Sequence, residues 1–233
     1  MKFGSITTGI IADGLVFNMD AANRASYPKE GTIITDTIAS ATGSFINGPT
    51  FLSPPTSASC WEFDGVDEGV AINGGNGIEA INVTNGLSVD CWVKSNGFSS
   101  WDYLCSSGGT GGTKSQLQLR FASNGGLYTS YQGSSYSTGI SDWDDGNWHH
   151  LAMTLNYNNG DVKFYKNAIQ GSTVLTYGST YSEANFKYIG TTSISGDNAI
   201  AGCIASLKLY NILLSPNQVL HNYNALKGRF GLT

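Results

Sequence analysis

The sequence predicts an all-β fold, an antiparallel two-sheet sandwich or jelly roll that carries one short C-terminal helix. Three observations support this fold class. Apolar and polar residues alternate with a period of two in several segments from residue 86 onward. Short stretches rich in Gly and Asn separate these segments, as tight antiparallel hairpins require. No helices alternate with the strands, which argues against a parallel sheet.

The composition is that of one folded domain. The chain has 233 residues, 40% of them hydrophobic and 12% charged, which is enough apolar material for one large core and excludes a disordered chain. Single β-sandwiches reach this length, so we expect one domain over residues 1–233, with an N-terminal arm over residues 1–12. The formal charge of −5 and the lack of a basic cluster argue against a nucleic-acid partner.

The sequence shows no export or membrane segment. Residues 1–10 contain one Lys but lack the apolar stretch of a signal peptide. No run of about 18 apolar residues predicts a transmembrane helix. We therefore expect a soluble protein without a membrane partner that is not secreted by the signal-peptide route.

The predicted strands follow in order. In residues 86–94, one side of the strand is apolar and includes Cys91, while the other carries Ser88, Asp90 and Trp92, which predicts one buried face. In residues 115–122 the side chains expected to point inward are Leu117, Leu119 and Phe121. The same alternation predicts strands over residues 151–157, 161–166, 186–189 and 203–210. Hairpin turns are predicted at residues 124–126 and 158–161.

A helix is predicted over residues 215–228. Ser215 is suited to cap its N-terminus, Pro216 fits the first helical position, and Gln218 is placed to complete a capping box. Gly228 is placed to end the helix in a left-handed conformation. The apolar residues at helical spacing, which should dock on the sandwich, are Val219, Leu220, Tyr223 and Leu226.

Cysteine and histidine side chains give no sign of a metal site. The four cysteines, at positions 60, 91, 105 and 203, have the spacing of neither a zinc site nor a small disulfide scaffold. Three pairings exist if they are oxidised, and we interpret them as free thiols of the core. His149 and His150 are neighbours on a strand and point to opposite faces, so they cannot hold one metal together.

Aromatic residues are scattered through residues 95–145, which we expect to form long loops and solvent-facing strands. They are Trp101, Tyr103, Tyr128, Tyr131, Tyr136 and Trp143. One interpretation is ordinary surface structure. The other is a platform for sugars or for another protein, because aromatic rings stack on the apolar side of a pyranose. The candidate carbohydrate-binding residues are Trp101, Tyr103, Tyr128 and Tyr131.

Five stretches, in order along the chain, resemble one family. They are GLVFNMDAANRASYP (14–28), FDGVDE (63–68), LSVDCWVK (87–94), WHHLA (148–152), and GCIASLKLY (202–210) followed by Leu214, Ser215 and the helix. They resemble laminin G-like, concanavalin A-like lectin/glucanase jelly-roll modules. The resemblance spans about residues 12–232 and implies the jelly-roll fold, with Trp148 facing inward.

The sequence departs from this family at three places. The Asn/Gly-rich turn of the family is replaced by residues 37–42, its acidic pair by Ala205 and Ser206, and its Asn-Gly hairpin by Asn167 and Ala168. These replacements argue against a polar or metal site built from those positions.

The C-terminal stretch NYNALKGRFGL, residues 222–232, is similar to the ending of such modules in structural proteins of tailed bacteriophages. Together with the missing signal peptide, this resemblance implies a virion component assembled in the host cytoplasm, either a head decoration protein or a tail appendage. Its partners would be other virion proteins and glycans on the host surface. A bacterial extracellular adhesion domain would need an export route that the sequence does not show.

A glycoside hydrolase is the alternative function, because concanavalin A-like sandwiches include endoglucanases. A retaining glycosidase needs two carboxyl groups roughly 5–5.5 Å apart, which alternate residues on one strand face, Glu62 and Asp64, would provide. Those enzymes continue the strand to another alternate Glu, whereas Gly65 and Asp67 predict a turn. No nucleophile-elbow signature is present either, so we expect a protein that is not an enzyme.

Asp64, Asp67 and Glu68 form a compact acidic cluster, and they are the candidate metal ligands. Some members of the family bind calcium at loop carboxylates, and calcium prefers such oxygen ligands. In the competing interpretation, Asp64 accepts hydrogen bonds from backbone amides in its turn and the other two side chains face water. Apart from this calcium hypothesis, we expect no cofactor.

Overall fold

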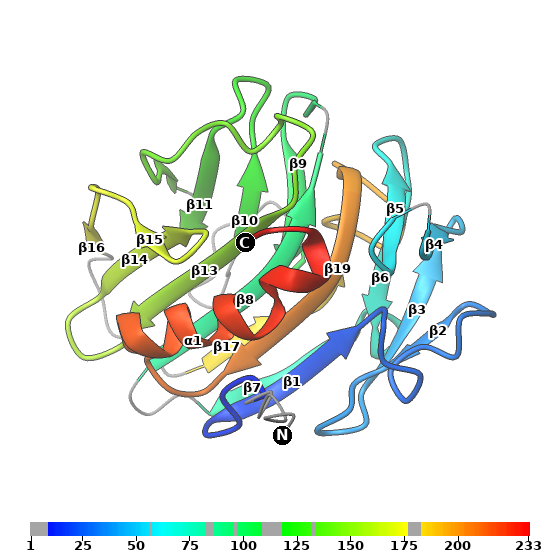
Figure 1. Cartoon of the computed structure of the whole chain (residues 1–233), viewed down its shortest axis with the longest axis horizontal. Coiled ribbons are helices and arrows are strands. Elements are labelled where there is room, and N and C mark those ends of the chain that lie inside the picture. Colours follow the sequence, from blue (N-terminus) through cyan, green and yellow to red (C-terminus); the bar gives the residue numbers. More distant parts are fainter. Residues whose placement is uncertain are drawn as a thin grey trace, which may run out of the picture.

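The computed structural model describes residues 9–55, 57–82, 86–95, 97–108, 118–131, 134–176 and 183–233. In these residues the chain forms two large antiparallel sheets and one α-helix close to the C-terminus (Figure 1), which confirms the predicted fold class. No helix of this part of the chain has the length and apolar character needed to span a membrane.

The first sheet contains the longest strands. Its members, in spatial order, are β15 (Ile169–Gln170), β14 (Asp161–Lys166), β13 (His149–Asn156), β8 (Gly86–Lys94), β19 (Ala201–Tyr210), β5 (Cys60–Asp64) and β4 (Thr50–Leu52). Two further strands join its sides, with β1 (Leu15–Asp20) paired to β19 and β16 (Leu175–Thr176) paired to β14.

The second sheet packs against the first. Its members, in spatial order, are β12 (Ser134–Ser137), β11 (Leu127–Tyr131), β10 (Gln118–Phe121), β9 (Asp102–Ser106), β18 (Tyr188–Ile189), β6 (Gly69–Ile72), β3 (Thr42–Ile46) and β2 (Ile33–Thr35). The remaining elements are the pair β7 (Ile78–Asn82) and β17 (Glu183–Phe186), the 3₁₀ turn η1 (Asn73–Gly75), the helix α1 (Pro216–Leu226) and the 3₁₀ turn η2 (Lys227–Phe230).

The main core lies between the two sheets. It contains every apolar side chain that the alternation placed on the inner face of β8, and both Leu119 and Phe121 of β10. Fully burying one such large side chain stabilises the fold by about 1.5–3 kcal/mol. The side chains predicted to face the core from these two strands are therefore confirmed for the described residues. Leu117 lies outside the described residues.

The outer face of β8 is buried as well, which corrects the prediction of a strand with one buried face. Trp92 on this face stacks on Phe230 of η2, with ring centroids 4.0 Å apart, and on Tyr223 of α1 at 5.8 Å. Trp148 also belongs to this outer cluster, with its ring 4.9 Å from that of Phe230. Trp148 is thus buried beneath the C-terminal segment, and not in the core between the sheets as the family pattern implied.

A buried polar network lies beneath α1. The Asp90 carboxylate is 2.9 Å from Nε2 of His150 and 3.3 Å from Nζ of Lys208, and it accepts a hydrogen bond from Nδ2 of Asn222 at 3.0 Å. All four residues are buried. Asn222 also donates to the hydroxyl of Tyr210 at 3.0 Å. The network therefore ties the helix to three strands of the first sheet.

The described part of the predicted N-terminal arm, residues 9–12, contacts the same helix. The amide of Ile11 donates to Oδ1 of Asn222 at 2.8 Å, and Nε2 of His221 lies 2.8 Å from the carbonyl oxygen of Gly9. Residues 1–8 of the predicted arm lie outside the described residues. The helix thus holds residues 9–11 near the first sheet.

The boundaries of several strands differ from the prediction. The strand over residues 161–166 is confirmed, but β13 begins two residues earlier than predicted, at His149, and β19 begins at Ala201. The segment predicted as one strand over residues 186–189 is interrupted at Lys187 and divided between β17 and β18. Both predicted hairpin turns are present, each with a glycine in the left-handed region, Gly125 at φ 68° and Gly160 at φ 77°.

The helix start is confirmed and its end is not. The hydroxyl oxygen of Ser215 accepts from the Gln218 amide, and the Gln218 side chain accepts from the Ser215 amide, so both bonds of the capping box exist. After Leu226 the chain continues as η2, and Gly231, at φ 74°, takes the left-handed conformation predicted for Gly228. Leu220 is exposed, because the helix faces the sheet with the buried residues Val219 and Asn222.

Candidate functional site

Three of the four candidate carbohydrate-binding residues come together on the outer face of the second sheet. Tyr103 on β9 and Tyr128 on β11 both stand opposite Arg120 on β10 in the strand pairing. Trp101, just before β9, places its ring 4.2 Å from the Arg120 guanidinium carbon and meets the Tyr128 ring edge-on at 5.3 Å. We call Trp101, Tyr103, Arg120 and Tyr128 the aromatic patch.

A β-bulge creates this arrangement. Leu119 pairs with Cys105, but Arg120 pairs with Tyr103, so β9 has one extra residue, Leu104, at this point. Leu104 and Cys105 both point into the core. Without the bulge, Tyr103 would not stand opposite Arg120, and the patch would lose its central contact.

The rings of the patch differ in exposure. Trp101 is 36% exposed and Tyr128 is partly buried, whereas Tyr103 is 4% exposed. The Tyr103 hydroxyl accepts a hydrogen bond from Nη1 of Arg120 at 2.6 Å. Tyr103 therefore supports the patch from below and does not offer an open ring, which corrects its predicted role in the platform. The backbone of Tyr131 pairs with Ser134, but its side chain lies outside the described residues.

Arg120 is the residue of the patch that sequence reasoning missed. Its guanidinium also lies 5.5 Å from the ring centroid of Tyr103, so two aromatic rings flank the cation. The Nε atom of Arg120 is buried without a hydrogen-bond partner. The signal was present in the sequence, since the alternation that placed Leu119 and Phe121 inward also places Arg120 outward.

Two other aromatic side chains of residues 95–145 pack in or against the core, although the segment also contains the predicted loops and the solvent-facing strand β12. Trp143 is fully buried, and its ring centroid lies 5.7 Å from those of Phe121 and His149. Tyr136 is partly buried and packs against the main core.

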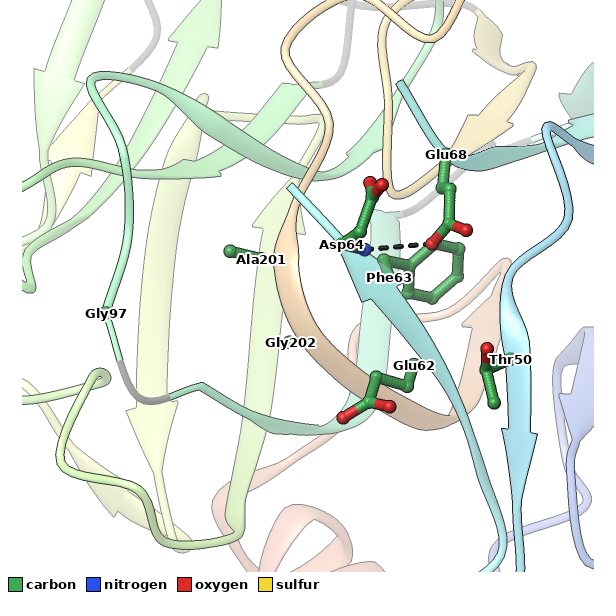
Figure 2. Close-up of a pocket in the computed structure, with 8 residues that line it drawn as sticks. All are labelled: Thr50, Glu62, Phe63, Asp64, Glu68, Gly97, Ala201 and Gly202. Carbon is green, nitrogen blue, oxygen red and sulfur yellow. Dashed lines mark hydrogen bonds between the residues drawn. The ribbon is translucent and has the colours of Figure 1, made fainter. Parts of the chain in front are cut away.

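A second candidate site is an open pocket of about 500 Å³ at the β4–β5–β19 side of the first sheet (Figure 2). Its lining residues are Thr50, Glu62, Phe63, Asp64, Glu68, Gly97, Ala201 and Gly202. The loop after β5 shapes it, because the Val66 amide donates to Oδ1 of Asp64 at 2.8 Å and Gly65 takes φ 77°. The predicted turn after Asp64 is thus confirmed.

The acids of this loop hold the loop itself. Oε2 of Glu68 accepts from the Asp64 amide at 2.8 Å, and the carbonyl oxygen of Asp67 accepts from Nδ2 of Asn47 at 3.0 Å. Asp67 is exposed, as expected for a side chain facing water, but Glu68 is partly buried and bound to the backbone. Among the described residues, no group of three or more His, Cys, Asp and Glu side chains is placed to hold a metal ion, so these acids do not form such a group.

Burial raises the pKa of Glu68. The hydrogen bond from the Asp64 amide lowers this pKa, while the negative charges of the neighbouring acids raise it further, and the net result lies above the ordinary value. Figure 2 shows the carboxylates of Glu62 and Asp64 directed away from each other, although both residues lie on the same face of β5. The two carboxylates therefore do not converge on one point, as a pair of catalytic acids in a glycosidase would.

The histidines and cysteines occupy structural positions. His149 packs on Trp143 and lies 2.9 Å from Asp145, while His150 points to the opposite side of β13, toward Asp90, as predicted. Burial lowers the pKa of His149, although Asp145 opposes that shift. All four cysteines are buried and free, which agrees with the prediction of core thiols.

Comparison with known proteins relates the chain to lectin-like and glucanase-like folds. A family model described as the concanavalin A-like lectin/glucanases superfamily matches residues 64–220. No curated protein sequence matches the chain.

Three solved structures illustrate the likeness. Trypanosoma rangeli sialidase in complex with sialic acid has a TM-score of 0.65 and 13% identity, over 93% of this chain and 33% of that one. The binding domain of botulinum neurotoxin DC in complex with rat synaptotagmin II has a TM-score of 0.67 and 14% identity, over 93% of this chain and 52% of that one. Domain 4 of AbnA, a GH43 extracellular arabinanase from Geobacillus stearothermophilus in complex with arabinotriose, has a TM-score of 0.63 and 19% identity, over 90% of this chain and 98% of that one.

At these identities the likeness shows a shared fold. This chain spans a third of the sialidase chain and about half of the neurotoxin binding domain chain. With the arabinanase domain it shares nearly the full length.

Proposed function

This chain belongs to the concanavalin A-like lectin/glucanases superfamily, and from that premise we propose that it is a glycan-binding module without enzymatic activity, with the aromatic patch as its sugar site. The observation that carries the proposal is the Trp101 ring, partly exposed over Arg120 and Tyr128. An indole held in this way offers a rigid apolar surface, and aromatic faces of this kind pack on the apolar side of a sugar ring.

The related structures support this choice of ligand. Their names describe complexes with sialic acid for the sialidase and with arabinotriose for the arabinanase domain. Another describes cell entry of botulinum neurotoxin type C as dependent on two ganglioside molecules. Sugar recognition therefore recurs in proteins that contain this fold.

The non-enzymatic part of the proposal is supported by the geometry of the acidic pocket. The carboxylates of Glu62 and Asp64 point apart in Figure 2, and Glu68 is bound to the Asp64 amide. One observation favours the competing function, a glycoside hydrolase, because a carboxyl group with a raised pKa, Glu68, lies beside a second acid, as general acid catalysis requires.

We also propose that the module works in the particle of a tailed bacteriophage, as a head decoration protein or tail appendage in contact with other virion proteins and with host-surface glycans. The support is the similarity of residues 222–232 to the endings of such phage proteins. Mass spectrometry of purified phage particles whose genome encodes this chain tests the proposed role in the virion. Particles that lack the polypeptide would rule this role out.

Glycan-array binding of the purified chain tests the sugar site. We expect binding to a defined set of glycans that Trp101→Ala abolishes, while Ile169→Ala, a change at an exposed side chain of the first sheet, leaves it intact. Binding that survives Trp101→Ala would remove the patch from the proposal.

A reducing-end assay on β-glucans and capsular polysaccharides tests the competing function. We expect no product. Hydrolysis that disappears in Glu62→Gln or Glu68→Gln would establish the enzyme instead.

A further inference from the structure

Arg120 occupies the centre of the aromatic patch, and its surroundings bear on the kind of sugar the patch would take. The guanidinium lies 4.2 Å from the Trp101 ring centroid and 5.5 Å from that of Tyr103. Nη1 of Arg120 donates to the Tyr103 hydroxyl at 2.6 Å. These contacts hold the cation of β10 against two aromatic side chains, one on β9 and one just before it.

No carboxylate neutralises this cation among the described side chains, where each ion pair involves other residues. The neighbour of Tyr103 in sequence is an acidic residue, Asp102, and it is buried. Its Oδ1 accepts from the Ser99 amide at 2.9 Å and its Oδ2 from the Ala201 amide at 2.9 Å. Asp102 therefore joins the segment before β9 to the start of β19, and no hydrogen bond or ion pair connects it to Arg120 in the described part of the chain.

Arg229 has a different environment from Arg120. Arg229 forms an ion pair with Asp20 at 2.7 Å and donates to the carbonyl oxygen of Ser59 at 2.7 Å. A structural arginine in this chain is thus matched with a carboxylate and a carbonyl oxygen. Arg120 is held instead by a phenol and two aromatic faces, and no described carboxylate compensates its positive charge.

From this contrast we infer that the aromatic patch selects acidic glycans, with the carboxylate of a uronic or sialic type of sugar on the Arg120 guanidinium and the sugar ring against Trp101. The inference rests on the proposed function and names its ligand class. A guanidinium presents a planar set of N–H donors that matches a carboxylate, and such charge-assisted bonds are stronger than neutral ones. The low polarity of the flanking rings strengthens the attraction.

The experiment compares acidic sugars with neutral counterparts of the same shape. The probes are a galacturonic acid oligosaccharide and its carboxyl-reduced form, and sialyllactose and lactose, measured by isothermal titration calorimetry with the full chain. We expect the acidic member of at least one pair to bind about tenfold more tightly or better, as one charge-assisted contact predicts. This preference should weaken as salt concentration rises.

Three variants assign the preference. Arg120→Gln should abolish the preference, so that the acidic sugar and its neutral counterpart bind with equal affinity. Lys166→Gln is the matched control, because Lys166 also lies over an indole ring, 5.1 Å from the centroid of Trp143, but belongs to β14 of the first sheet. If Arg120→Gln does not fold, Arg120→Lys keeps the charge but loses the planar donor set, and it should reduce the preference as well.

The outcomes separate this inference from the proposed function. Equal affinity for the acidic and neutral members of both pairs, with both lost in Trp101→Ala, would overturn the acidic preference and leave the sugar site standing. Binding of sulfated but not carboxylated sugars would also overturn the carboxylate assignment. Binding of neither pair, with a silent glycan array, would overturn both proposals.

Discussion

Replacing Asp90 by Asn tests whether the buried polar network holds the C-terminal segment on the first sheet. The Asn side chain keeps the size of the carboxylate but removes its charge. Lys208, which is 1% exposed, then loses its counter-charge, and its other described hydrogen bond goes to the neutral hydroxyl of Ser206 at 3.0 Å. The change therefore leaves an ammonium group buried without compensation.

The expected loss of stability is large. Breaking a buried ion pair by removing one partner destabilises a protein by roughly 3–5 kcal/mol. In a domain of this size, 1 kcal/mol shifts the melting temperature by about 2–4 °C, so Asp90→Asn should lower it by roughly 6–20 °C. Losing the buried ion pair should first weaken the stacking of Tyr223 and Phe230 on Trp92.

The same network predicts how stability depends on pH. Burial raises the pKa of Asp90, but the charges of His150 and Lys208 outweigh burial and hold this pKa well below its usual range. A carboxyl group with a depressed pKa in the folded state stabilises the protein above its unfolded-state pKa of about 4, and this contribution disappears as pH falls toward the folded-state pKa. The difference between wild type and Asp90→Asn should therefore be complete at pH 7 and smaller at pH 3.

Urea unfolding followed by tryptophan fluorescence at pH 7 and pH 3 measures both effects. The matched control is Asp13→Asn, which removes a carboxylate from an exposed position and should change stability by less than about 0.5 kcal/mol. A loss below about 1 kcal/mol for Asp90→Asn at pH 7 would show that the buried pair does not stabilise the helix, because the expected minimum is threefold larger.

Three further predictions concern packing and local geometry. Trp148→Ala should cost roughly 3–5 kcal/mol, because the ring is buried against Phe230, and an unchanged melting temperature would contradict this packing. Ala168→Gly should stabilise the β14–β15 turn by about 1 kcal/mol, because Ala168 takes φ 64°, and a lower melting temperature would rule out the strain. Cys60 and Cys203, which lie in the same buried cluster, should be the pair that oxidised glutathione converts to a disulfide, seen by peptide mass spectrometry, and a different pairing would refute this proximity.

The local pattern of β8 predicted its core face but not the burial of its other face. Alternation shows which residues share a side, since the period is a property of the strand itself. The cover over Trp92 comes from α1 and η2, more than a hundred residues later in the chain. The apolar spacing of the helix predicted that it docks on the sandwich, but not that it covers β8. The buried polar residue Asn222, on the sheet-facing side of α1, explains this position once the structure is known.

The sequence predicted which aromatic residues form the candidate site, but not the strand pairing that brings them together. Aromatic residues in a Gly- and Ser-rich segment indicated a platform, and three of the four candidates meet there. Their meeting depends on the bulge at Leu104, which shifts the pairing of β9 with β10 by one residue. A single sequence does not encode such a shift visibly, because both Leu104 and Cys105 are ordinary core residues.

The two sheets use their outer faces differently, and this separates the stabilising polar network from the proposed sugar site. The outer face of the first sheet is closed by α1 over the Asp90 network, while that of the second sheet carries the aromatic patch. Substitutions at sites without shared partners act independently. Asp90→Asn, assayed well below its melting temperature, should therefore bind glycans like wild type, whereas Trp101→Ala should lose binding and keep its melting temperature within about 2–4 °C, equivalent to 1 kcal/mol. Loss of glycan binding in folded Asp90→Asn would show that the helix side of the sandwich is part of the sugar site.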